Sequence, residues 1–158
     1  MKFPSLQEVK QELQEKSPKQ LLELCLSLAK YKKDNKEYLG YLLFQAQDRE
    51  GFIAEIKKEI DDRFSEIQVL TNLYPIRKSL RATLRFVNKY CKYMGDKAVT
   101  AELLIYFCRK IKKSEIPIQK STRIENLFNT QIKRIGSAIS DLHEDLQSDF
   151  LRELKEIT

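Results

Sequence analysis

Tryptophan is absent from this chain of 158 residues, and only four glycines and four prolines occur, whereas Leu, Ile, Lys, Glu and Gln dominate. The abundant residues favour helix by intrinsic propensity, and glycine and proline are the two that disfavour it most. The apolar content of 42% supplies a core without disulfides or a metal. We therefore expect an all-α protein.

Motifs for catalysis are also missing from the sequence. The glycines, Gly40, Gly51, Gly95 and Gly136, are isolated from one another, so no glycine-rich phosphate loop occurs. His143 is the single histidine, and neither a paired-histidine helix motif nor a Glu-x-x-His di-metal pattern is present. We expect a non-enzymatic protein with no metal, no cofactor and no small-molecule substrate.

Neither a membrane segment nor a disulfide framework is indicated. No apolar run approaches the roughly 20 residues that cross a bilayer, and the first residues lead into a polar helix. The three cysteines, Cys25, Cys91 and Cys108, are widely spaced and fall at apolar helix positions, which favours reduced core residues. These features predict a cytoplasmic protein that does not contact membranes.

Helix start signals divide the chain into six to seven helices. Ser5 with Glu8, and Ser17 with Gln20, have the spacing of capping boxes. Short linkers favour antiparallel neighbours, so we expect a single helical domain, residues 1–158, built as a bundle or a short helical-repeat array. The predicted helices cover residues 5–16, 17–33, 34–46, 48–67, 74–94, 96–113 and 122 to nearly the end, with one clear loop at 114–120.

The last predicted helix is long. Its apolar residues recur in steps of three or four from Ile124 to Leu154. Unbroken, it would extend on the order of 50 Å at about 1.5 Å per residue. Gly136-Ser137 is the expected place for a bend or break, and the spacing also resembles a coiled-coil seam, which would allow self-association.

A weak internal repeat relates residues 17–70 to residues 73–158. The segments 29–31 and 88–90 each end a predicted helix, and each is followed by a tight turn and a further helix. A duplication would give two three-helix units after an N-terminal helix. Chance similarity among Leu- and Lys-rich helices is the alternative.

Carboxylates are absent between Glu66 and Asp96, where six of the 29 intervening residues are basic. Residues 73–120 hold 12 Lys/Arg and only three Asp/Glu, whereas the segments before and after carry a slight negative charge. Arg77, Arg81 and Arg85 recur every fourth residue, which places them on one side of a helix. Something negative is expected to lie against that side.

Two interpretations of this basic side compete. Phe86, Tyr90 and Tyr93 flank it, and cations beside aromatic rings can bind a phosphate chain and stack on its bases, although core packing would equally explain the rings. The final helix carries an acidic ridge with the same four-residue spacing, at Asp141, Asp145, Asp149 and Glu153. The two ridges could meet within one molecule, or between molecules and direct assembly.

The sequence therefore predicts non-covalent association rather than catalysis. We expect a protein partner or self-association, and a nucleic acid whose phosphates contact the same residues is the alternative. The expected interaction residues are Arg77, Lys78, Arg81, Arg85, Lys89 and Lys92, together with Arg109, Lys110 and Lys113 at the end of the next helix.

Overall fold

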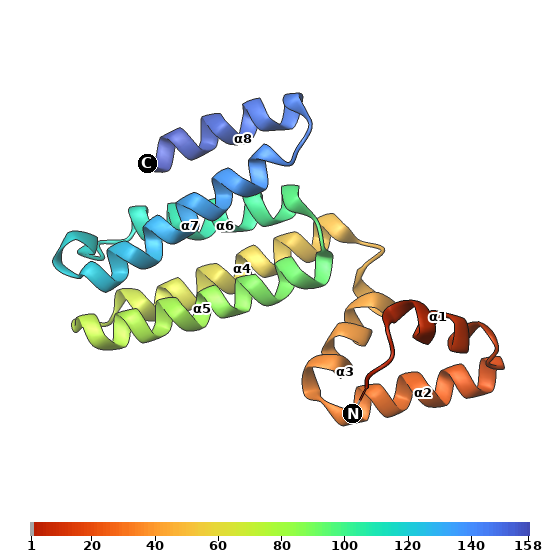
Figure 1. The fold of residues 1–158 in the computed structure, drawn as a ribbon. Helices are drawn as coiled ribbons and strands as arrows, with labels where there is room; N and C mark the ends of the chain where they lie inside the picture. The colour runs from red at the N-terminus through yellow and green to blue at the C-terminus, as the bar shows by residue number, and fades with distance from the viewer. Residues whose placement is uncertain (1) are drawn as a thin grey trace. The chain divides into compact units, whose positions relative to one another are not determined.

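The computed structural model describes residues 2–158, which form eight α-helices, a short π-helix and a 3-10 turn, and no strand (Figure 1). The all-α prediction is confirmed, and the predicted count of six to seven helices is too low. None of the helices in residues 2–158 has the length and apolar character needed to cross a membrane.

Two compact units make up the chain, one ending at Gln47 and one spanning Asp48–Thr158, and each is described here by itself. The expectation of one domain with a duplication at 17–70 and 73–158 stays a prediction.

The first unit contains α1 (Leu6–Gln14), α2 (Pro18–Tyr31), α3 (Lys33–Gly40) and the π-helix Tyr41–Gln45. Both predicted capping boxes form: the Ser5 hydroxyl accepts from the Glu8 N–H, and the Ser17 hydroxyl accepts from the Gln20 N–H. Helix α2 packs on α3.

Asn35 and Cys25 show how the first unit is arranged locally. The Asn35 side-chain amide donates to the Leu28 carbonyl at 2.8 Å and covers the end of α2. Cys25 is exposed rather than part of a core.

The second unit is a bundle of α4 (Arg49–Gln68), α5 (Leu73–Met94), α6 (Lys97–Lys113), α7 (Thr122–Ser140) and α8 (Glu144–Ile157), with the 3-10 turn Ile118–Lys120 before α7. Helix α6 packs against the four other helices and is buried on more than one face, as its apolar pattern predicts. Helix α8 lies on α6 and α7, on the side away from α4 and α5 (Figure 1).

The turn between α5 and α6 follows the sequence closely. Gly95 adopts φ 63°, the left-handed conformation that glycine accepts without strain. The Asp96 carboxylate then accepts from the N–H groups of Ala98 and Val99, which satisfies free donors in the first turn of α6.

The prediction of one long C-terminal helix is wrong. Helix α7 continues through Gly136 and ends at Ser140, and α8 begins at Glu144. The side-chain amide of Gln147 donates to the carbonyl oxygens of Ser140 and Leu142, at 3.3 and 2.7 Å, and thereby satisfies acceptors at the end of α7. The reversal also buries Ile157, which an extended helix would leave in solvent.

Candidate interaction surface

Helix α5 presents a basic side opposite its buried stripe. The buried stripe consists of Ile76, Leu80, Thr83, Val87 and Cys91. Positions four residues apart lie on the same side of a helix, so the cations gather away from this stripe. We call the six basic residues of this helix, Arg77, Lys78, Arg81, Arg85, Lys89 and Lys92, the α5 basic face.

Most of this face lacks a counter-ion within the second unit. No carboxylate oxygen of residues 48–158 lies within 4 Å of the charged groups of Arg77, Lys78, Arg81, Arg85 or Lys92. All of these five except the half-buried Arg77 are exposed. Exposed like charges at a spacing of four destabilise a helix by about 0.2–0.5 kcal/mol per pair, so the arrangement opposes folding slightly.

The aromatic residues beside the α5 basic face pack against other side chains. Tyr90 meets Phe52 of α4 edge to face at 5.4 Å between ring centroids and meets Phe86 at 4.9 Å. The Arg63 guanidinium covers the Phe86 ring at 4.4 Å. These contacts favour the core-packing interpretation of the rings over base stacking.

Arg109, one of the predicted interaction residues on α6, contacts α8 instead of facing solvent. Its guanidinium donates to the carboxylates of Glu153 and Glu156, at 2.9 and 3.4 Å. The side chain retains 28% of its exposure. These two contacts join α6 to α8.

Lys110, the next predicted residue, joins a polar network with α4. Its ammonium lies 2.8 Å from Asp61, which also accepts from the Tyr106 hydroxyl at 2.8 Å. Burial alone would raise the pKa of Asp61, but the hydrogen bonds from Lys110 and Tyr106 outweigh it and lower that pKa. Burial, reinforced by the hydrogen bond to Asp61, raises the pKa of Tyr106 to about 12.

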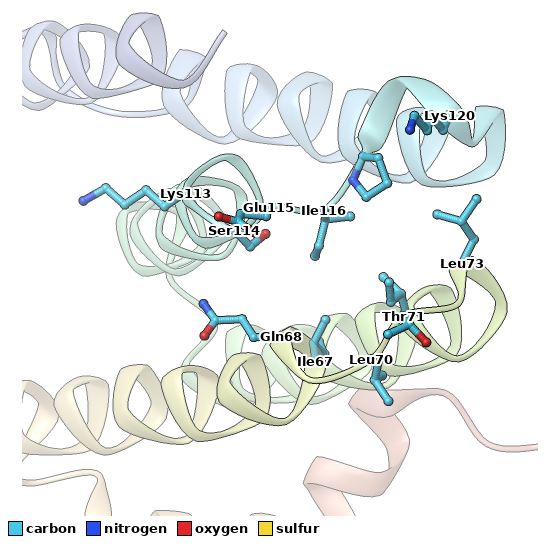
Figure 2. Close-up of a pocket in the computed structure, with 12 residues that line it drawn as sticks. Ile67, Gln68, Leu70, Thr71, Leu73, Lys113, Ser114, Glu115, Ile116 and Lys120 are labelled. Carbon is cyan, nitrogen blue, oxygen red and sulfur yellow. The ribbon is translucent and has the colours of Figure 1, made fainter.

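Lys113, the last predicted residue, is exposed at a pocket of about 610 Å³ between the α4–α5 turn and the segment after α6 (Figure 2). Ile67, Leu73 and Ile116 contribute apolar lining. Figure 2 shows the Lys113 side chain directed away from these apolar residues. Lys113 therefore does not point into the apolar part of this pocket.

The acidic ridge predicted for the C-terminus pairs with α6 and not with α5. Asp141 lies 3.1 Å from the Lys97 ammonium, and Glu153 contacts Arg109. Asp145 and Asp149 are exposed on α8, which lies on the side of the bundle away from α5 (Figure 1). Within the second unit, the acidic ridge therefore does not neutralise the α5 basic face.

The basic surface continues beyond α5 into a cleft of about 460 Å³ that is lined by residues of α5, α6 and α7. Lys92, Lys97 and Arg134 contribute cations from the three helices, and Thr100 and Ser137 contribute hydroxyl groups. Lys97, Arg134 and Ser137 were not predicted as binding residues, because helical periodicity carries no information on which helices meet.

Other reactive groups are poorly placed for chemistry. No set of three His, Cys, Asp or Glu residues within 2–158 is arranged to hold a metal ion. The His143 side chain is exposed, 3.5 Å from Asp145. Burial raises the pKa of Cys91 to about 11 and that of Cys108 to about 12, so both thiols stay protonated at neutral pH.

In comparisons with known proteins, no family model, no curated protein and no solved structure matches the chain. A proposal about function therefore depends on the charge and geometry of the surface.

Proposed function

We propose that the protein is a non-catalytic interaction and assembly module that binds an acidic protein surface through the α5 basic face. The observation that carries the proposal is the row of cations at Arg77, Lys78, Arg81 and Arg85 without a carboxylate of residues 48–158 in reach. A row that opposes folding is understandable if a partner's negative charge compensates it.

The internal ion pairs support this choice by contrast. Lys57, Arg109 and Lys110 each lie within 3 Å of a carboxylate on a neighbouring helix of the bundle. The second unit thus neutralises cations that face its own helices and leaves Arg77, Lys78, Arg81 and Arg85 without such neighbours. Either a different protein or the acidic side of a second copy would supply the complementary charge.

Nucleic acid is the competing partner, since phosphates would satisfy the same cations. The packed rings of Phe86 and Tyr90 remove the stacking platform that single-stranded binding uses, which favours a protein partner. We also propose a cytoplasmic location, which agrees with three cysteines that form no disulfide.

Affinity capture with full-length protein tests the proposal. We expect a protein partner, or a second copy, that the wild type retains after nuclease treatment and that an Arg81→Glu, Arg85→Glu variant loses. A Lys58→Glu, Lys133→Glu variant has the same change in net charge at exposed sites outside the face, on α4 and α7, and should retain the partner.

Two outcomes would count against this function. Equal loss in both variants would show a general effect of net charge rather than a specific face. Loss of the captured material on nuclease treatment would indicate nucleic acid, which should then bind with an affinity that falls steeply with salt.

A further inference from the structure

The cleft at the end of α5 has an excess of positive charge that its own carboxylates do not neutralise. Asp96 is the carboxylate in its lining; it pairs with Arg49 and also caps α6. Lys97 pairs with Asp141 at 3.1 Å. These pairs leave Lys92 and Arg134 as two cations without a carboxylate of residues 48–158 within 4 Å.

Arg134 is held in place by neutral groups. Its Nη1 atom donates to the side-chain oxygens of Asn88 on α5, at 2.8 Å, and of Gln131 on α7, at 3.1 Å. Neither contact removes the positive charge, and the Nε and Nη2 donors are not engaged by them. A guanidinium fixed in this way binds an anion with a smaller loss of side-chain entropy than a free one.

The Ser137 hydroxyl can complete an anion site. It lies one helical turn after Arg134 and lines the same cleft. The Thr100 hydroxyl also lines the cleft, but it donates its single proton to the Asp96 carbonyl at 2.8 Å and has none left for an anion. A ligand with several acceptor oxygens would therefore meet cations from three helices and the Ser137 hydroxyl.

We propose that this cleft binds a phosphate monoester dianion, with Arg134 and Lys92 as the charged ligands and Lys97 and Ser137 as further donors. Two uncompensated cations match the roughly two negative charges that a monoester carries at neutral pH. A carboxylate or a phosphodiester brings only one charge to the same position. The guanidinium fork of Arg134 suits two phosphate oxygens at once.

The dianion could be inorganic phosphate or a phosphorylated side chain of a protein that contacts α5. Titration of ¹⁵N-labelled full-length protein with inorganic phosphate, with phenyl phosphate and with a phosphoserine peptide distinguishes these sources. The unphosphorylated peptide is the control for the third. We expect saturable shifts of the amides around Lys92 and Ser137 with at least one of the three.

Variants separate this site from the contact proposed for the rest of α5. Arg134→Gln should weaken phenyl phosphate binding about tenfold, because one charge-assisted contact is lost. Arg81→Glu, Arg85→Glu should change it at most about threefold at physiological salt, where charges farther than about 8 Å are largely screened. The two proposals can therefore fail separately. Partner capture can fail while phosphate binding persists, and phosphate binding can fail while partner capture persists.

Protonation gives a second readout that a fold defect would not mimic. Affinity should fall as the pH drops through about 6, because the monoester dianion takes up a proton there and becomes a monoanion. Constant affinity from pH 5 to 8, equal binding of acetate, or no saturable shift with any of the three phosphate ligands at millimolar concentration would overturn the proposal. An oligonucleotide that binds more tightly than phenyl phosphate and depends on Arg134 would also overturn it.

Discussion

Replacement of Arg81 by glutamate should stabilise the second unit. Arg81 is exposed, with Arg77 and Arg85 one helical turn to either side. Each like-charge pair at this spacing costs about 0.2–0.5 kcal/mol, and each opposite-charge pair gains about as much. Since Arg81→Glu converts two repulsive pairs into two attractive ones, we expect the free energy of unfolding to rise by about 1 kcal/mol at low salt.

Urea unfolding followed by circular dichroism measures this change. The gain should nearly vanish in 1 M NaCl, where the Debye length is about 3 Å. In thermal unfolding the same gain corresponds to about 4 °C for a unit of this size. Glutamate and arginine have similar helix propensity, so the effect comes from charge.

The matched control is Arg152→Glu on α8, where the same substitution has the opposite effect. Arg152 lies 3.5 Å from Asp149, and Glu156 is four residues later. This variant should lose a few tenths of a kcal/mol. A loss of more than about 1 kcal/mol for Arg81→Glu would refute the reasoning, because it would show that Arg81 has a stabilising partner in the folded protein.

Three further predictions concern the internal contacts. Arg109→Ala should lower the free energy of unfolding by about 1 kcal/mol through loss of its two partly exposed ion pairs on α8, as measured by urea unfolding; an unchanged value would show that these pairs do not hold the helix. Folded-state pKa values of Asp61 and Asp96 below their usual value of 3.8 stabilise the protein above that pH, and this stability is lost as pH falls through the lowered values. Asp61→Asn should therefore show a smaller fall in stability between pH 5 and 3 than the wild type, and an equal fall would contradict the assigned network. A thiol reagent should leave Cys91 and Cys108 unmodified in the folded protein and modify both in urea, and rapid reaction of either in the folded protein would contradict its burial.

Local signals in the sequence predicted much of the fold. The capping residues Ser5, Ser17 and Asp96 accept hydrogen bonds from residues two or three positions further on, so their partners could be identified without a structure. Gly95 ends α5 because few other residues accept its backbone conformation. These helix caps and this turn depend on neighbouring residues in the sequence and little on tertiary contacts.

The end of α7 could not be predicted in the same way. Helical periodicity continues through residues 141–143, and Gly136 seemed the weaker point. The break instead follows from the contact of Gln147 with the end of α7 and from the ion pairs that hold α8 on α6. Both sets of contacts form only when α8 folds back on the bundle, so the sequence pattern of one helix does not reveal them.

The candidate surface, like the fold, could be predicted from the sequence only in part. Spacing alone placed Arg77, Arg81 and Arg85 on one side of α5, and the structure adds that carboxylates of the bundle do not reach them. Arg134 is on α7 and reaches Asn88 of α5 only because the helices of the bundle pack together. This packing places Arg134 near the end of the α5 basic face. A pattern within one helix could not show this neighbour.

Direct observation of the bound surface tests the central claim, that α5 binds an acidic protein surface. ¹⁵N-labelled protein is titrated with a helical peptide that carries glutamate at every fourth position, in wild type and in the Arg81→Glu, Arg85→Glu variant. We predict saturable amide shifts along residues 77–92 in the wild type and none in the variant. Shifts confined to α8 or to the first unit, or the same shifts in both proteins, would contradict the assignment.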